Sequence, residues 1–319
     1  MTFVETMALP NAVRLIDDYH LDRPGVIGTY VLLGDEPALI DPGPTTVLPH
    51  LEMGLQALGL TLDDIRAVLL SHIHLDHAGA TGTIVARNPH VKVYVHQRGA
   101  PHIVAPERLL RSAARLYQDM MDYLWGEFCA VPQDNVVPLS GGEMVQLGSR
   151  KLQVYDAPGH ASHHVVYFEE ASGAAFIGDN GGVCLPGSSH SRPATPPPDI
   201  DVEAWVQTLN MVLDLQPKWL LLTHFGAMDN PARYIDDYRT RLLQWADIVQ
   251  NGMQSGADEA AQIAQLQARA DADLGASADS ELGVRYQQAI SLEQTWQGLV
   301  RYWQKRAERE HAAGNQDLI

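Results

Sequence analysis

Four potential metal ligands lie within one short segment of the chain, Ser71-His72-Ile73-His74-Leu75-Asp76-His77. The segment directly follows Ala67-Val68-Leu69-Leu70, an apolar run that is typical of a short buried strand. In extended chain His72 and His74 point the same way, whereas Asp76 and His77 turn the corner towards a second point. One such loop can serve two metals about 3.5 to 4 Å apart, provided that other strand ends supply the remaining ligands.

Three later residues are placed to supply them. His160, Asp179 and His224 each follow an apolar segment that reads as a strand. Because the three segments are far apart in the sequence, each residue comes from a different strand. A rigid sheet edge can hold such side chains in a fixed geometry.

The rest of the chain predicts an α/β fold with a helical end. A Pro-, Ser- and Gly-rich surface loop is expected at 183–198, and the composition changes near residue 229, after which we expect roughly three helices. We therefore predict a catalytic domain over residues 1–228 and a helical C-terminal extension over 229–319. Strands are predicted at 26–33, 38–40, 67–70, 91–96, 152–155, 164–168, 174–177 and 219–222, and helices at 45–58, 80–88 and 202–215, with a long helical insert at 106–128.

The charge balance bears on partners. The formal net charge is −17, and no Lys/Arg-rich run could follow a phosphate backbone, so nucleic acid and anionic membranes are not expected partners. Two cysteines are too few for a disulfide scaffold, and the sequence shows neither a signal-like start nor an apolar run of about 18 residues. We expect a cytoplasmic protein that acts on a small molecule, and a homodimer is compatible with the sequence.

The segment from His72 to His77 is an HxHxDH motif, and with it the chain resembles the metallo-β-lactamase-fold hydrolase superfamily, in particular its glyoxalase II-like branch. The resemblance covers roughly residues 10–228 and implies the four-layer αββα fold. It also implies two divalent metal ions per chain, with zinc the leading choice and iron, manganese or cobalt compatible with the ligands. By the resemblance, His72, His74 and His160 hold one metal, Asp76, His77 and His224 hold the other, and Asp179 bridges them together with a hydroxide.

The resemblance further implies that Asp76 and Asp179 are catalytic, and that Asp41 in Asp41-Pro42-Gly43 supports the metal site through hydrogen bonds. The function it implies is hydrolysis of a small ester-like bond, namely a thioester, lactone, carboxylic ester or phosphoester, by the bridging hydroxide. The alternative is a glyoxalase II-like sulfur dioxygenase that holds iron in a single site.

The chain differs from two known branches of this superfamily, so it cannot be assigned to either subclass. The basic residues with which glyoxalase II relatives hold glutathione have no recognisable counterpart near the C-terminus, and the tyrosine that lactonases carry after the bridging aspartate is replaced by Asn180. We expect a neutral or weakly charged substrate with an apolar portion, in a cleft shaped by the insert and the helical tail.

Several neighbouring residues invite a role. His163 and His164 fall on opposite faces of a strand, so at most one can face the metals, and a structural or cavity-lining role is favoured. Cys184 receives no metal role. The apolar residues of the insert are compatible either with a substrate cleft or with plain core; they are Tyr117, Met120, Met121, Tyr123 and Trp125.

Overall fold

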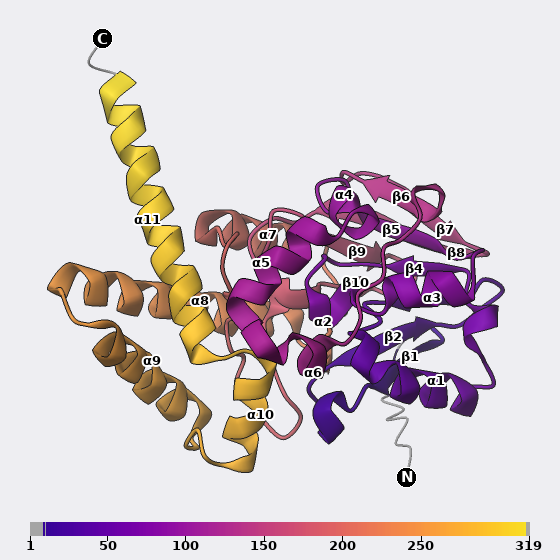
Figure 1. Ribbon diagram of the computed structural model, residues 1–319, viewed down its shortest axis with the longest axis horizontal. Helices are drawn as coiled ribbons and strands as arrows, with labels where there is room; N and C mark the ends of the chain where they lie inside the picture. The colour runs from indigo at the N-terminus through magenta and orange to yellow at the C-terminus, as the bar shows by residue number, and fades with distance from the viewer. Residues whose placement is uncertain (1–8, 10, 317–319) are drawn as a thin grey trace.

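The computed structural model describes residue 9 and residues 11–316, with side chains up to residue 311. Residues 1–8 at the start of the predicted first domain, and 317–319 at the end of the predicted extension, lie outside the described residues. The described chain forms two six-stranded sheets, whose strand orders are β1-β2-β3-β4-β5-β6 and β12-β11-β10-β9-β8-β7 (Figure 1). The first sheet contains β1 (Val13–Asp17), β2 (Gly28–Leu32), β3 (Ala38–Ile40), β4 (Ala67–Leu69), β5 (Lys92–His96) and β6 (Val136–Leu139). The second contains β7 (Met144–Leu147), β8 (Arg150–Asp156), β9 (Val165–Glu169), β10 (Ala174–Phe176), β11 (Trp219–Leu222) and β12 (Gly226–Met228).

Alternation of apolar side chains along the strands builds the layers. In β3, Ala38 and Ile40 belong to a core shared with the second sheet, whereas Leu39 points to the opposite face and packs with helices. In β9, Tyr167 lies in the shared core and Val166 in a core on the outer face. Because successive side chains of a strand point to opposite faces, each sheet is buried on both sides. The predicted four-layer αββα fold is confirmed.

Helices cover both outer faces of the paired sheets. Most helices of the first half of the chain pack on the first sheet, and most of the later helices pack on the second. The first group contains α1 (Leu48–Ala57), α2 (Leu75–Ala78), α3 (Thr81–Arg87), α4 (Ala100–Val104), α5 (Glu107–Tyr117) and α6 (Met121–Trp125). The second contains α7 (Val202–Asp214), α8 (Pro231–Ser255), α9 (Glu259–Leu274), α10 (Glu281–Ala289) and α11 (Leu292–Gln316).

The insert and the tail differ in detail from the sequence prediction. The 106–128 insert is not one long helix: it breaks at Gln118, which adopts a left-handed φ of 48°, and resumes as α6. The described part of the tail contains four helices rather than roughly three, because α9 and α10 are separate elements. Three of these helices, α8, α9 and α11, share the outer core of the second sheet, where Leu242 and Leu266 pack with Trp205 of α7. The fourth, α10, instead packs Tyr286 into the core between the two sheets. The boundary at residue 229 stays a prediction.

The sheets place four loops at one end of the fold. They follow β4, β8, β10 and β11, and each carries at least one of the ligands that the sequence predicted. Within the described residues, no helix combines the length and the apolarity that crossing a membrane requires.

Candidate metal centre

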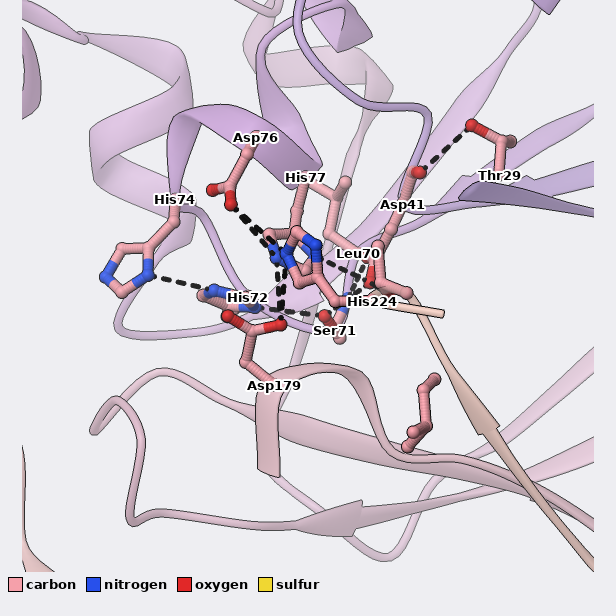
Figure 2. Close-up of polar contacts among 12 residues, drawn as sticks. Thr29, Asp41, Leu70, Ser71, His72, His74, Asp76, His77, Asp179 and His224 are labelled. Carbon is pink, nitrogen blue, oxygen red and sulfur yellow. Dashed lines mark hydrogen bonds and ion pairs between the residues drawn. The ribbon is translucent and has the colours of Figure 1, made fainter. Parts of the chain in front are cut away.

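The predicted ligands lie together where loops of the two sheets meet, and Figure 2 labels all of them except His160. The loop after β4 and the start of α2 carry four of them, and the loops of the second sheet carry the other three. They form two groups in which one side-chain atom from each residue lies within 4.8 Å of the others: His72, His74 and His160 in the first group, and Asp76, His77, Asp179 and His224 in the second.

Three ring nitrogens converge in the first group. Nδ1 of His74 lies 3.0 Å from Nε2 of His72 and 2.9 Å from Nε2 of His160. A single proton on His74 could satisfy only one of these contacts well, so without a cation at least one pair of nitrogen lone pairs would face each other. Three imidazole nitrogens arranged in this way suit a metal ion.

Asp179 connects the two groups. Its Oδ1 lies 3.2 Å from Nε2 of His77 and 3.5 Å from Nε2 of His224, both in the second group. Its Oδ2 lies 3.5 Å from Nε2 of His160, in the first group. The carboxylate of Asp179 therefore turns one oxygen to each group, and Asp76 completes the second group with its Oδ2 3.3 Å from Nε2 of His224.

The far nitrogen of several ligands is held by another group. Nδ1 of His160 donates to the carbonyl of Ala194 at 2.8 Å, and Nδ1 of His224 donates to the carbonyl of Val26 at 2.7 Å. Each of these bonds places the proton on Nδ1 and leaves the lone pair of Nε2 directed at the group. His72 has the same tautomer, because Ser71 Oγ donates its only proton to Asp41 and accepts from Nδ1 of His72 at 3.0 Å.

Asp41 is the hub beneath the site. Its Oδ2 accepts hydrogen bonds from the hydroxyls of Ser71 at 2.6 Å and Thr223 at 2.8 Å, and from Nδ1 of His77 at 3.0 Å. Its Oδ1 accepts from the Ser71 amide at 2.7 Å. Asp41 is fully buried and has a φ of 50°, a left-handed conformation that few residues other than glycine, asparagine and aspartate adopt. The turn after β3 thus holds this carboxylate against the ligand loops of both sheets.

The electrostatics of the first group keep its histidines neutral. Burial lowers the pKa of His72, His74 and His160, in the case of His74 to about 3, and neighbouring imidazoles lower it further. Neutral imidazole is the form that binds metals.

The second group is charged. Burial acts to raise the pKa of Asp76 and Asp179, but His77 and His224 hold both values below the usual range. Burial acts to lower the pKa of those two histidines, and the carboxylates raise it above 6.5. Two carboxylates so close together and so little exposed therefore require positive charge beside them.

Two buried atoms without hydrogen bonds also indicate that these donors suit divalent cations. Nε2 of His77 and Oδ1 of Asp179 are buried and, although they lie 3.2 Å apart, neither makes a hydrogen bond in the described structure. Buried polar atoms are normally satisfied, so this pair points to a missing partner. Nitrogen and oxygen donors without thiolate suit zinc, iron, manganese or cobalt.

Residues around the ligands have other roles. His164 is buried, and its Nδ1 lies 3.0 Å from the side-chain amide nitrogen of Asn180. Its ring stacks on that of His72 with ring centroids 5.0 Å apart. His163 lines the neighbouring cavity. Neither belongs to the two ligand groups, and the free thiol of Cys184 is buried outside them.

Sequence reasoning missed several supporting residues. Ser71 and Thr223 each precede a ligand at a strand end. Their positions beside His72 and His224 could have predicted that they support the ligands. Asn180 was noted only for what it replaces, yet its side-chain amide donates to the carbonyl of Ala157 and its side-chain oxygen accepts from the amide of His160. No local pattern predicts that long-range link.

A cavity of about 980 Å³ opens above the ligands. His74, Asp76 and Asp179 lie in its wall, together with parts of the insert and of the helical tail from Gln287 to Gln294. Tyr117, Met120, Tyr123 and Trp125 line it, whereas Met121 packs in a small core beneath it. The expected contribution of both elements to a cleft is confirmed.

Comparison with known proteins agrees with this geometry. The family profile of the Metallo-beta-lactamase superfamily matches residues 23–224. The metallo-beta-lactamase fold-containing protein ST1585 of Sulfurisphaera tokodaii is 24% identical over 239 residues, which cover 72% of this chain and 83% of that protein. A hydroxyacylglutathione hydrolase of Hahella chejuensis is 31% identical over 144 residues, which cover 44% of this chain and only 41% of that protein.

Solved structures show the same fold. The metallo-beta-lactamase family protein TTHA1429 from Thermus thermophilus superposes with a TM-score of 0.63 at 22% identity, covering 88% of this chain and 89% of that one. The family match spans more than half of the chain and contains all seven ligand positions. The chain belongs to the metallo-beta-lactamase superfamily.

Proposed function

We propose that this metal-dependent hydrolase is binuclear, with zinc the leading choice of metal, and that it cleaves a small ester-like bond: a thioester, lactone, carboxylic ester or phosphoester. The observation that carries the proposal is the position of Asp179, whose two oxygens face two separate groups of donors. Two-metal sites with such a shared carboxylate are typical of hydrolytic chemistry.

The proposed ligands divide as the two groups do. His72, His74 and His160 would hold one ion, Asp76, His77 and His224 the other, and Asp179 would contact both. When bound, such ions polarise a carbonyl or phosphoryl oxygen and lower the pKa of water towards 7.

Side chains beside the proposed ions differ in how far they are exposed to the cavity. Asp76 has 18% of its side chain exposed, against 6% for Asp179, and both line the cavity. Asp76 is therefore the more accessible of the two carboxylates to a substrate in the cavity. The apolar cavity walls around Leu75 and Trp125 restrict water near the reacting bond.

Tyr117 offers a hydroxyl in the same cavity. Burial raises the pKa of this phenol, and Asp76 raises it further, so the group stays protonated and can donate a hydrogen bond. Its ring packs edge-on against Trp125 with centroids 5.1 Å apart. Tyr117 would orient a substrate oxygen beside the ligands.

The name of the Hahella relative supports a thioester among the candidate bonds, since a hydroxyacylglutathione hydrolase acts on one. Because that match covers only 41% of the relative, the proposed substrate class rests on the residues of this chain's own site.

The test is a hydrolysis panel on purified protein with elemental analysis of the same sample. We expect metal-dependent turnover of at least one aryl ester, lactone, thioester or phosphoester, abolished by chelation and restored by adding back the metal found. Asp237→Asn, an exposed carboxylate on α8, is the control that should keep full activity.

If the purified protein with its metal hydrolysed none of these substrates, the result would contradict the proposal. Iron in a single site, with oxygen consumption that depends on a persulfide substrate, would assign the chain to the dioxygenase alternative instead.

A further inference from the structure

The cavity above the proposed metal site has a charge unlike that of the whole chain. The chain carries 22 Lys and Arg residues against 39 Asp and Glu residues. Five of those cations line this one cavity: Arg23, Arg98, Arg108, Arg111 and Arg115. The acidic residues in its wall are the two proposed ligands and Asp199, which already accepts a hydrogen bond from the amide of Ser162 at 2.9 Å.

Three of the arginines lie in sequence along α5. Arg108, Arg111 and Arg115 are spaced by three and four residues, so at about 100° per residue they fall within roughly 60° of the helix circumference. They follow each other over about 10 Å of helix. Within the described part of the chain none of the three forms an ion pair or a side-chain hydrogen bond, and all three side chains are exposed and border the cavity.

Helix α5 presents two different edges to the cavity. Measured from the middle of the arc that the arginines span, its apolar lining residues Leu109, Ala113 and Leu116 lie roughly 110° to 170° round the helix. Ala113 packs with Leu75, the residue between His74 and Asp76, in a small core completed by Trp125. The apolar edge of α5 therefore lies against the ligand loop, and the arginine edge lies away from it, at a distance on the order of the 10 Å width of a helix.

We propose that the cavity selects an ester or thioester whose tail, remote from the scissile bond, carries two or more negative charges. This inference rests on the proposed function for the position of the scissile bond. The apolar part of the substrate lies along Leu109, Leu116 and Trp125, and the charged groups meet Arg108, Arg111 and Arg115. Guanidinium groups bind phosphates and carboxylates through paired hydrogen bonds, and both kinds of tail share this chemistry.

The surrounding charge makes such a cluster informative. At a net charge of −17 the chain repels polyanions at long range, and attraction must come from cations within about 8 Å, the screening length at physiological salt. Unpaired arginines at the rim of a cavity supply that local field. The sequence predicts a neutral or weakly charged substrate, and a neutral substrate would leave these arginines without a role.

The experiment uses three thioesters with the same acyl group and the same scissile bond. Octanoyl-coenzyme A has a phosphorylated tail, S-octanoylglutathione has a carboxylated tail, and S-octanoyl-N-acetylcysteamine is neutral. The test variant is R108Q/R111Q/R115Q, and the charge-matched control is R66Q/R87Q/R233Q, which removes three exposed arginines outside the cavity.

For the test variant we expect kcat/KM to fall about 10- to 100-fold on at least one charged thioester and to stay within about twofold on the neutral one. The control should stay within about twofold on all three. The charged thioester that loses more identifies the tail as phosphorylated or carboxylated. An equal loss on neutral and charged thioesters, or no loss on any, would overturn the inference.

A binding measurement separates this inference from the proposed function. S-octyl-coenzyme A, S-octylglutathione and S-octyl-N-acetylcysteamine are thioethers that cannot be hydrolysed, and calorimetry gives their Kd on each variant. Tighter binding of a charged thioether, lost in the test variant and kept in the control, supports the anionic tail even if no thioester is hydrolysed. Equal Kd values for charged and neutral thioethers on the unmodified chain overturn it, even if the hydrolase activity stands.

Discussion

Nδ1 of His77 in α2 donates a hydrogen bond of 3.0 Å to Oδ2 of Asp41, in the turn after β3. The same oxygen accepts from Ser71 and Thr223, and Thr223 precedes a ligand from the second sheet. One carboxylate thus fixes ligand loops from both halves of the fold.

Replacing this carboxylate tests its role. We expect Asp41→Asn to weaken metal binding about 10- to 100-fold, because the amide cannot accept all of these hydrogen bonds and His77 loses its orientation. Competition with a chromophoric chelator measures the affinity. Asp35→Asn, an exposed aspartate before β3, is the control. Unchanged affinity in Asp41→Asn would show that the hub does not support the ligands.

Metal content is the second prediction. We expect two ions per chain, and we expect their removal to lower the unfolding temperature, since the bare site leaves buried atoms of His77 and Asp179 without partners. Elemental analysis and thermal unfolding before and after chelation measure both. A content that never exceeds one ion, even after supplementation, would contradict the two-site proposal.

The third prediction concerns the shared carboxylate. Asp179→Asn should lower turnover by more than the about 10- to 100-fold that follows loss of a residue supporting a ligand, because it alters contacts to both groups at once. Circular dichroism should show an intact fold. A variant with full turnover and full metal content would exclude the bridging role.

The fourth prediction concerns how α11 sits on the body of the protein. A Cβ at Gly298 would lie 1.9 Å from the carbonyl oxygen of Thr195, so Gly298→Ala must displace the helix from the loop at 183–198. We expect a loss of about 1 to 3 kcal/mol in the free energy of unfolding. Denaturant unfolding measures it, with the exposed Gln304→Ala on the same helix as control. Equal stability of the two variants would mean that this contact is not tight.

Much of the fold could be predicted where apolar runs end in turns. The strands at 38–40 and 219–222 match β3 and β11, since both are short, continuous apolar runs buried on both faces. Strands β1, β6, β7 and β12 were missed. In β7, at an edge of its sheet, the exposed Met144 is as apolar as the buried Val145, so the sequence does not alternate as the burial does. Strand β12 is only three residues long, so neither strand carries a strong local pattern.

In the candidate site, too, some features could be predicted from the sequence and others could not. The ligand positions could be read from a motif and from strand ends, because those signals are local. The arginine edge of α5 was equally readable as spacing, but only the position of the helix beside Leu75 shows that it borders a cavity. The break at Gln118 could not be read at all, because the apolar spacing continues through it.

The division of the ligands between the sheets has a consequence for the order of events as the chain folds. The first sheet contributes four of the seven donors and the second contributes three, and Asp179 reaches donors of both. A nascent chain that has folded only its first half presents an incomplete set of donors. We therefore expect tight metal uptake to follow the docking of the two halves, and bound metal to slow their separation.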